Sequence, residues 1–485
     1  MTGRAGRLLI GGTGSNVGKS MIVTGLCRSL VRRGVDVAPF KAQNMSLNSE
    51  VTSDGDEIGR AQAAQARAAR LDATVQMNPV LLKPGNNGCS QVVVLGHPIG
   101  ERGAGEYQRD KGDLLGVVAA AFEQLAAEHD VVLAEGAGSV AEINLRKGDL
   151  VNFGLARAVG APVVVVGDID RGGVFAAFIG TLAALDLADA ALLRGFIVNR
   201  FRGDASLLTP AIDDLRGRTG RSLYGVIPEQ IGLELDAEDS LAAHPFAQPV
   251  PPLGSDVLRI GVVDVPHLSN LTDVDPLALE PGVIVRMLRV GEEVADVDIV
   301  ILPGSRAVVS DLEWCRQRRF DGAIRDAAGR GTTVIGICGG YQMLGSAIED
   351  HVESSAGRVE ALGLLAVSTQ FDREKVLRRH SSQVGRMTGY EIRHGQVNQN
   401  YGAVWFEDEG TVEGAVMGTS WHGVFENDEF RRALLASAAE RAGREFVVSE
   451  SVCFSAVRER YYELLADLVD EHLDVDSLLD LASSS

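Results

Sequence analysis

The chain has 485 residues, of which 45% are hydrophobic and 23% are charged, and its formal net charge is −20. A chain of this length is too long for one hydrophobic core, so two or three domains are expected. The strong negative charge argues against a nucleic-acid partner, which would need a basic face, but a local basic cleft for a small anion is compatible with it.

The five cysteines are widely spaced and form no CxxC pair, which favours a reducing compartment and argues against structural zinc. The N-terminus leads into only a short apolar run at residues 8–10, and no apolar segment is long enough to span a bilayer. We therefore expect a cytoplasmic protein with neither a membrane nor a nucleic acid as partner, and we infer no obligate protein partner.

Short apolar, β-branched runs alternate with longer amphipathic stretches, such as the helix expected at residues 114–128. This alternation is typical of a mostly parallel sheet that carries helices on both faces. The buried strands expected in the first half of the chain are at residues 8–11, 35–38, 131–134, 163–166 and 196–198.

The alternation stops at residues 247–255, which read AQPVPPLGS. Prolines disfavour helix and sheet alike, so this stretch is expected to be a linker. Strands are expected again at residues 258–263 and 297–302. We therefore expect an α/β fold of two domains, a P-loop domain at 1–247 and a second α/β domain at 256–450.

The C-terminal tail, residues 451–485, carries apolar residues at helical spacing with acidic residues between them. This periodicity predicts one or two helices that each bury one face. We expect these helices to pack on the second domain rather than to bind a partner protein.

Residues 11–20 read GGTGSNVGKS, between the first expected strand and an expected helix. The string departs from the strict G-x-x-x-x-G-K-[ST] pattern, because five residues separate Gly12 from Gly18. The chemistry survives the longer loop, since backbone N–H groups face the phosphates of ATP, Lys19 neutralises their charge and Ser20 can hold Mg²⁺. The expected ATP-binding residues of this loop are Gly12, Thr13, Gly14, Ser15, Asn16, Val17, Gly18, Lys19 and Ser20.

This longer loop resembles that of the dethiobiotin synthetase-like branch of P-loop enzymes, and two further positions fit that branch. Glu135 ends an expected strand, so its carboxylate lies at the ligand-binding edge of a parallel sheet, where a contact with Mg²⁺ or substrate is expected. Asn199 follows another expected strand and resembles the asparagine that recognises adenine in these enzymes. The alternative for Glu135 is an exposed loop carboxylate without a ligand, and the alternative for Asn199 is an ordinary asparagine in a turn at the end of a strand.

Glycines surround one cysteine in the string GICGG, residues 336–340, which follows an expected strand at 332–335. A G-x-C-x-G turn between a strand and a helix exposes a nucleophile on a tight, strained turn. The helix N-terminus beyond Cys338 favours the thiolate. The alternative is a buried structural cysteine, but packing alone does not explain the two flanking glycines.

A nucleophilic cysteine needs a base, and the strongest candidate among nine histidines is His422 in the string GTSWHGVF, residues 418–425. It lies well downstream of Cys338, as expected for a partner that meets the cysteine only in the folded chain. A lone histidine is more often structural, so this assignment depends on Cys338.

Together, Cys338 and His422 resemble the catalytic pair of class I (triad-type) glutamine amidotransferases, over most of the second domain. That resemblance implies that a loop containing Gly304, in the string LPGS, and the residue Gly339 supply backbone N–H groups to an oxyanion hole. It also implies that Gln342, four residues after the nucleophile, contacts bound glutamine.

One departure from that family concerns the third member of the triad. Many members have His-Pro-Glu, in which the glutamate orients the base, whereas this chain has His-Gly-Val at residues 422–424. The same departure occurs in the subgroup of cobyrinic and cobyric acid synthases. The third member is therefore not identified, and the nearby Glu426 is given no role.

A P-loop and a glutaminase in one chain imply ATP-dependent amidation. ATP phosphorylates a carboxylate, glutamine releases ammonia through a thioester on Cys338, and ammonia displaces phosphate. Residue chemistry alone does not name the carboxylate.

Strings along the whole chain resemble the cobyric acid synthase family. They are residues 39–46 (PFKAQNMS), 54–62 (DGDEIGRAQ), 78–84 (NPVLLKP), 135–139 (EGAGS), 168–175 (DIDRGGVF), 199–204 (NRFRGD) and 389–395 (GYEIRHG). The resemblance implies a ligase of cobalamin biosynthesis. Its corrinoid substrate is adenosylcobyrinic acid a,c-diamide, whose b, d, e and g side-chain carboxylates are amidated with glutamine and ATP.

An anionic corrinoid agrees with basic residues in loops expected at the C-terminal ends of strands, although any one of them is also compatible with a solvated surface charge. The candidate substrate-binding residues are Lys41, Gln43, Asn44, Lys83, Asp170 and Arg171, with Arg200 and Arg202 as further basic residues. The candidate Mg²⁺ ligands are Ser20, Glu135 and Asp54.

Two alternative functions remain open. Cobyrinic acid a,c-diamide synthase shares both domain types, but the strings QNM at 43–45 and DRGG at 170–173 favour the cobyric acid synthase family over it. A P-loop switch ATPase with a degenerate amidase domain is an alternative from a different class, and the intact pair of Cys338 and His422 argues against it.

Overall fold

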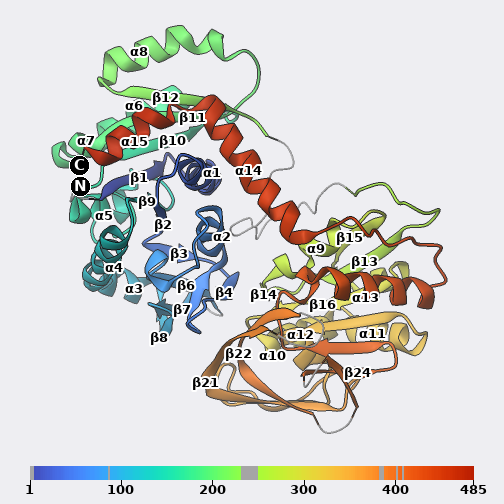
Figure 1. Cartoon of the computed structure of the whole chain (residues 1–485). Helices are drawn as coiled ribbons and strands as arrows, with labels where there is room; N and C mark the ends of the chain where they lie inside the picture. The colour runs from blue at the N-terminus through green and yellow to red at the C-terminus, as the bar shows by residue number, and fades with distance from the viewer. Residues whose placement is uncertain are drawn as a thin grey trace. The chain divides into compact units, whose positions relative to one another are not determined.

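The computed structural model describes residues 5–85, 88–230, 249–381, 387–399, 402–406 and 409–484. The chain forms two compact units. Unit 1 comprises Met1–Ser46, Thr52–Glu238 and Arg458–Ser485, and unit 2 comprises Leu47–Val51 and Asp239–Val457. Both units combine strands with helices (Figure 1), which confirms the expected α/β fold of two domains. Part of the expected linker, residues 247–248, lies outside the described residues.

Unit 1 is built on a six-stranded parallel sheet. In spatial order its strands are β12 (Ser222–Pro228), β11 (Leu193–Phe201), β10 (Val163–Asp168), β1 (Gly6–Gly12), β9 (Val131–Glu135) and β2 (Val37–Phe40). All five strands expected in this half of the chain are confirmed, with ends shifted by up to a few residues. The register places Leu9 of β1 opposite Val163 on one side and Ala134 on the other.

A smaller sheet of unit 1 has the order β3 (Gln43–Met45), β6 (Val80–Pro84), β7 (Cys89–Val94) and β8 (His97–Gly103), and the short strand β5 (Glu57–Gly59) lies outside this sheet. The α-helices of unit 1 are α1 (Lys19–Arg32), α2 (Arg60–Ala68), α3 (Ala104–Asp110), α4 (Leu114–Glu128), α5 (Phe153–Val159), α6 (Val174–Ala184), α7 (Leu187–Leu192), α8 (Thr209–Thr219), α14 (Phe454–His472, from residue 458) and α15 (Val475–Ser483). Its 3-10 helices are Val75–Met77, Lys111–Asp113, Ile143–Leu145 and Ala205–Leu208.

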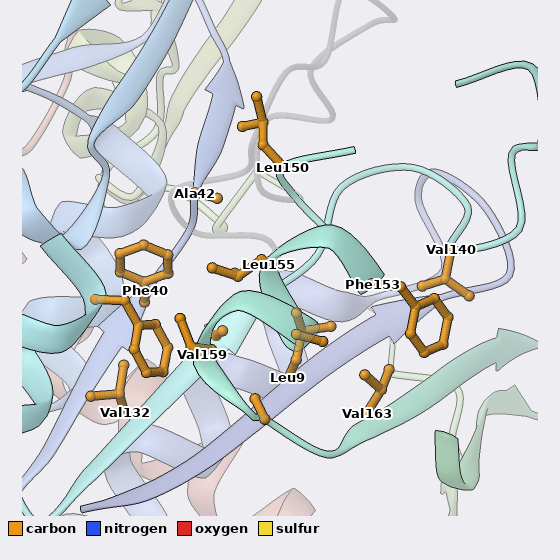
Figure 2. Packing of buried hydrophobic residues seen from close by; sticks show 14 of the residues in the cluster. Leu9, Phe40, Ala42, Val132, Val140, Leu150, Phe153, Leu155, Val159 and Val163 are labelled. Carbon is orange, nitrogen blue, oxygen red and sulfur yellow. The ribbon is translucent and has the colours of Figure 1, made fainter. Parts of the chain in front are cut away.

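The sheet of unit 1 is buried on both faces. Neighbouring side chains of a strand point to opposite faces. Accordingly, Leu9 lies in the cluster shown in Figure 2, whereas Leu8 and Ile10 lie in a second cluster. This arrangement explains why the strands read as continuous apolar runs.

The C-terminal helices α14 and α15 belong to the second of these clusters. Leu465 and Val469 of α14 are buried there together with Leu26 of α1. Arg28 of α1, whose side chain has no exposed surface, donates hydrogen bonds to Glu459 at 2.9 Å and to other acceptors. The expectation that the tail packs on the second domain is therefore wrong, because its apolar face completes the core of unit 1.

Unit 2 contains a seven-stranded mixed sheet. In spatial order its strands are β15 (Val283–Leu288), β13 (Leu258–Val263), β16 (Ile299–Leu302), β18 (Thr333–Ile337), β25 (Val416–Thr419), β24 (Glu409–Glu413) and β23 (Ala403–Phe406). The first five are parallel, and β24 and β23 are antiparallel. The strands expected at 258–263, 297–302 and 332–335 are confirmed as β13, β16 and β18.

A second sheet of unit 2 has the order β20 (Gly357–Glu360), β19 (Ala347–Asp350), β21 (Val367–Ser381) and β22 (Thr388–Gln399), and a two-stranded ribbon joins β14 (Leu268–Ser269) to β17 (Gly304–Ser305). Strand β4 (Ser49–Val51) also belongs to this unit. Its α-helices are α9 (Asp275–Ala278), α10 (Val308–Gln317), α11 (Phe320–Gly329), α12 (Gly339–Leu344) and α13 (Asp428–Arg441), and its 3-10 helices are Leu271–Val274, Gly291–Asp296 and Val424–Glu426. In the described parts of the chain, no helix has both the length and the apolar character needed to cross a membrane.

Candidate active sites

The phosphate loop of unit 1 connects β1 to α1, as expected from the sequence. Gly18 caps α1 with a left-handed backbone, φ +96°, and a Cβ at this position would collide with the side chain of Asn199. Asn199 itself is buried and donates a hydrogen bond from Nδ2 to the carbonyl of Val17 at 2.8 Å. The asparagine expected at the adenine therefore also supports the loop backbone. Lys19 lies over the loop, with Nζ 2.9 Å from the carbonyl of Gly14.

Glu135, at the end of β9, is the centre of a buried polar network. Its Oε1 accepts hydrogen bonds from Ser20 at 2.8 Å and from Lys41 at 3.0 Å, and its Oε2 accepts one from Gln65 at 2.6 Å. Adjacent parallel strands end at one edge of the sheet, which brings a residue of the phosphate loop beside the end of β9. The structure thus joins three of the expected site residues and adds Gln65.

The two lysines expected in substrate-binding loops are instead buried in ion pairs. Lys41 pairs with Glu135 at 3.0 Å, and Lys83 pairs with Glu57 at 2.6 Å. Lys83 lies within strand β6 rather than in a loop, which corrects the expectation from the sequence. A buried pair is costly to break, so these lysines hold the site together as well as carrying positive charge.

The remaining candidates of unit 1 lie at different depths. Gln43 accepts a hydrogen bond from Tyr107 at 2.6 Å, and Asn44 donates one to Gln62 at 2.9 Å. Asp170 and Arg171 lie exposed in the loop after β10. Asp170 contacts Arg202 at 3.4 Å.

Asp54 lies exposed in a turn, and the hydrogen bonds of Glu135 described above do not include it. Among all the residues that the structure describes, no group of three or more His, Cys, Asp or Glu is arranged to hold a metal ion. Asp54 as a metal ligand stays a prediction from the sequence.

In unit 2, Cys338 lies between β18 and α12 with a left-handed φ of +49°. A non-glycine residue in this region is strained, and such strain is concentrated at functional turns. A Cβ on Gly336 would lie 2.7 Å from the backbone N of Tyr341, so the tight turn requires glycine there. The strained elbow expected from the sequence is present.

Burial raises the pKa of the Cys27 and Cys315 thiols, which disfavours their reactive thiolate form.

His422 is buried, and its ring is held by a carboxylate that the sequence analysis did not identify. Its Nδ1 lies 2.6 Å from Oδ2 of Asp273, and the amide N–H of Gly423 donates to the other oxygen at 2.8 Å. The ring of Tyr390 stacks on His422 with centroids 5.4 Å apart. With Nδ1 engaged by Asp273, the other ring nitrogen is available to the thiol of Cys338, whose proximity raises the pKa of His422.

The protonation of His422 follows from these contacts. Burial alone lowers its pKa, but the charge of Asp273, followed by that of Cys338, outweighs burial and raises the pKa to about 10. The imidazolium form is therefore favoured at neutral pH. A thiolate beside an imidazolium is the reactive form of a catalytic cysteine.

The expected oxyanion loop is the ribbon of β14 and β17, in which Ser269 pairs with Gly304 and Leu268 pairs with Ser305. A Cβ on Gly339 would lie 2.7 Å from the backbone N of Ser305. The Gly304–Ser305 strand therefore runs directly beside the residue that follows the nucleophile. Backbone N–H groups grouped in this way can stabilise an oxyanion.

Asp311 of α10 contacts Ser305 of β17 and also His267, the residue before β14. Its Oδ2 accepts a hydrogen bond from the Ser305 hydroxyl at 2.6 Å, and its Oδ1 lies 2.8 Å from Nδ1 of His267. Asp311 has no exposed surface. The side-chain bond to Asp311 raises the pKa of His267, despite the opposing effect of burial.

Gln342 of α12 is buried, and its Nε2 donates to the carbonyl of Gly395 at 3.5 Å. Its Oε1 has no hydrogen-bond partner among the described residues. A buried acceptor without a partner is costly. It is satisfied if a ligand presents an N–H group there, as the amide or ammonium of glutamine does.

Comparisons with known proteins agree with both sites. Residues 8–242 match the family described as the CobQ/CobB/MinD/ParA nucleotide binding domain, and residues 259–430 match the CobB/CobQ-like glutamine amidotransferase domain. The chain is 53% identical to a protein of Streptomyces coelicolor named cobyric acid synthase, over 99% of this chain and 97% of that protein. Proteins of the same name from Frankia casuarinae (51% identity, 98% of this chain and 96% of that protein) and Mycolicibacterium smegmatis (50%, 99% and 97%) are similar over comparable lengths.

Proposed function

The chain belongs to the cobyric acid synthase family, and we propose that it converts adenosylcobyrinic acid a,c-diamide to adenosylcobyric acid by amidating the b, d, e and g side-chain carboxylates. Glutamine supplies the nitrogen, and ATP activates each carboxylate. The assembly of Cys338, His422 and Asp273 in unit 2 is the observation that carries this proposal.

Unit 2 releases ammonia from glutamine. His422 holds the proton of Cys338, and the thiolate attacks the side-chain amide carbon of glutamine. The N–H groups of Gly339 and of the Gly304–Ser305 strand stabilise the oxyanion that forms. His422 then donates its proton to the departing nitrogen, which leaves as ammonia, and water hydrolyses the thioester to give glutamate and the free thiol.

Unit 1 activates the acceptor. A corrinoid carboxylate attacks the γ-phosphorus of ATP, which gives an acyl phosphate and ADP. Ammonia then attacks the acyl carbon, phosphate leaves and the amide remains. Lys19 and the backbone N–H groups of residues 12–18 stabilise the phosphates.

Ser20 and Glu135 are the residues that would hold Mg²⁺. Their oxygens lie 2.8 Å apart beside the phosphate loop, and hydroxyl and carboxylate oxygens are ligands that Mg²⁺ prefers. When bound, Mg²⁺ neutralises phosphate charge.

The corrinoid is expected at the polar residues that surround this network. Gln43 and Asn44 lie on β3, Asp170 and Arg171 lie in the exposed loop after β10, and Lys41 and Lys83 carry the buried positive charges. These assignments rest on the resemblance of their strings to the family and, for Lys41, on its contact with Glu135.

The number of amides formed tests the proposed function. The protein is incubated with adenosylcobyrinic acid a,c-diamide, ATP and glutamine labelled with ¹⁵N in its side-chain amide, and the corrinoid is analysed by mass spectrometry. A product with four labelled amides agrees with the proposal. Activity only on cobyrinic acid, with two amides formed, would instead identify an a,c-diamide synthase, and no glutamine hydrolysis under any condition would favour a P-loop switch.

A further inference from the structure

The segment Leu47–Val51 lies, in sequence, between strands β3 and β5 of unit 1, yet it belongs to unit 2. Its strand β4 is buried, with Ser49 1% and Val51 2% exposed. The ordering of this segment costs conformational entropy, which its contacts within unit 2 help to offset.

One of these contacts is to the turn that carries Asp273. The backbone N–H of Ser49 donates to Oδ1 of Asn270 at 2.9 Å. Asn270 is buried, has a left-handed φ of +52° and begins the 3-10 helix Leu271–Val274. Its carbonyl accepts the N–H of Asp273 at 2.9 Å. The segment thus fixes the residue from which the Asp273 turn begins.

A second contact is to the strand that lies against Cys338 and His422. Val51 packs with Tyr390 and Ile392 in a small buried cluster. Tyr390 stacks on His422 and exchanges two backbone hydrogen bonds with it, at 3.1 and 2.8 Å. The carbonyl of Ile392 lies 3.8 Å from Sγ of Cys338. Val51 thus supports residues that touch both the base and the nucleophile.

We propose that Leu47–Val51 is a positioning segment of the glutaminase site, supplied by the acceptor-binding part of the sequence. It braces the Asp273 turn through Ser49 and the Tyr390–Ile392 strand through Val51. Its ends continue directly into the stretches that carry Gln43, Asn44 and Glu57. Glutamine hydrolysis therefore depends on a short segment that lies far, in sequence, from the rest of the amidase unit.

The test uses two variants and a matched control in the full-length protein. Val51→Ala removes the methyl groups that contact Tyr390 and Ile392. Asn270→Gly removes the acceptor of the Ser49 N–H while it allows the left-handed backbone. Val294→Ala, at a valine that is 1% exposed in a different cluster of unit 2, is the control for the loss of buried methyl groups.

For Val51→Ala and Asn270→Gly we expect kcat of glutamine-dependent amidation to fall about tenfold, because small displacements of a catalytic group slow the reaction strongly. The KM for glutamine and the amidation rate with supplied ammonium salts should stay within about twofold of the unmodified protein. Val294→Ala should leave all three values within about twofold.

An unchanged kcat with glutamine in both variants would overturn the proposal, as would an equal loss of ammonia-dependent amidation or an equal loss in Val294→Ala. The inference rests on the proposed glutamine-dependent amidation. If the unmodified protein forms no amide with either nitrogen source, the proposed function itself has failed, and this result differs from every result expected of the variants.

Discussion

Oδ2 of Asp273 lies 2.6 Å from Nδ1 of His422, and the same carboxylate accepts the N–H of Gly423 through its other oxygen. Two bonds to consecutive residues fix both the ring and the backbone that carries it. Asp273 makes the contact with the histidine that the glutamate of a His-Pro-Glu string, absent here, would make. It lies on a different loop, 149 residues before the histidine.

Asp273→Asn should slow glutamine hydrolysis by on the order of 10³-fold, because the amide neither stabilises the imidazolium nor fixes the tautomer that faces Cys338. Ammonia-dependent amidation should be unchanged, since unit 1 performs that reaction. Steady-state assays of glutamate release and of amide formation check both expectations. Asp298→Asn is a matched control, because Asp298 is also buried but precedes β16 at the opposite end of that strand from Gly304. Equal effects of the two substitutions would show that Asp273 has only a structural role.

The pH dependence of glutamine hydrolysis should follow the raised pKa of His422. A histidine in solution loses its proton near pH 6.5, whereas Asp273 and Cys338 outweigh burial and keep the pKa of His422 at about 10. Because the raised value favours the protonated folded state, the associated stability is present below about pH 6.5 and is lost as the pH rises to about 10.

We therefore expect kcat for glutamine to remain level as the pH rises past neutrality and to fall only as it approaches 10. In Asp273→Asn the fall should occur at lower pH, because the largest contribution that raises the pKa is gone. A rate profile in which the unmodified protein loses activity near pH 6.5 on raising the pH would contradict this explanation.

Asp311→Asn should lower kcat for glutamine about tenfold, since each side-chain bond that aligns an oxyanion donor contributes through geometry. Ser305→Ala, which removes the other partner of the 2.6 Å bond, should have a similar effect. The double variant should be little worse than either single variant, because both changes remove the same bond. Additive losses in glutaminase assays would mean that Asp311 does not act through Ser305.

The sequence alone was sufficient for the parts of both sites that form within one stretch of chain. The phosphate loop, the elbow at Cys338 and the expected strands are local patterns, since a few neighbouring residues determine the backbone there. Charge balance and glycine spacing are also visible without a fold. The expected strands are confirmed, apart from ends that shift by a few residues, and the expected strand–loop–helix order is present at both the phosphate loop and Cys338.

The missing parts depend on residues that are distant in sequence. Asp273 resembles any other aspartate until the fold brings it to His422. Lys41 and Lys83 appeared as free loop charges because their partners, Glu135 and Glu57, cannot be identified from spacing. Helical periodicity showed that the tail has an apolar face but not which core receives that face, and the tail was therefore assigned to the wrong unit.

Glu135→Gln should abolish amidation with either nitrogen source, because Ser20 and Lys41 lose the carboxylate that positions them. It also breaks the buried ion pair between Glu135 and Lys41, which is 4% exposed. Removing one partner of a buried pair costs about 3–5 kcal/mol, so thermal unfolding should occur at a lower temperature. The double variant Glu135→Gln, Lys41→Met should recover stability but not activity. Normal amidation by Glu135→Gln would remove this carboxylate from the synthetase site.

The most direct test of the account compares glutamine with ammonium salts as nitrogen source for Cys338→Ala, with amide formation on the corrinoid measured by mass spectrometry. We expect no amide with glutamine and a normal yield with ammonia, because Cys338 only supplies ammonia to the chemistry of unit 1. Lys19→Ala should form no amide with either source. Amidation by Cys338→Ala with glutamine, or its failure with ammonia in a folded protein, would contradict the separation of the two activities.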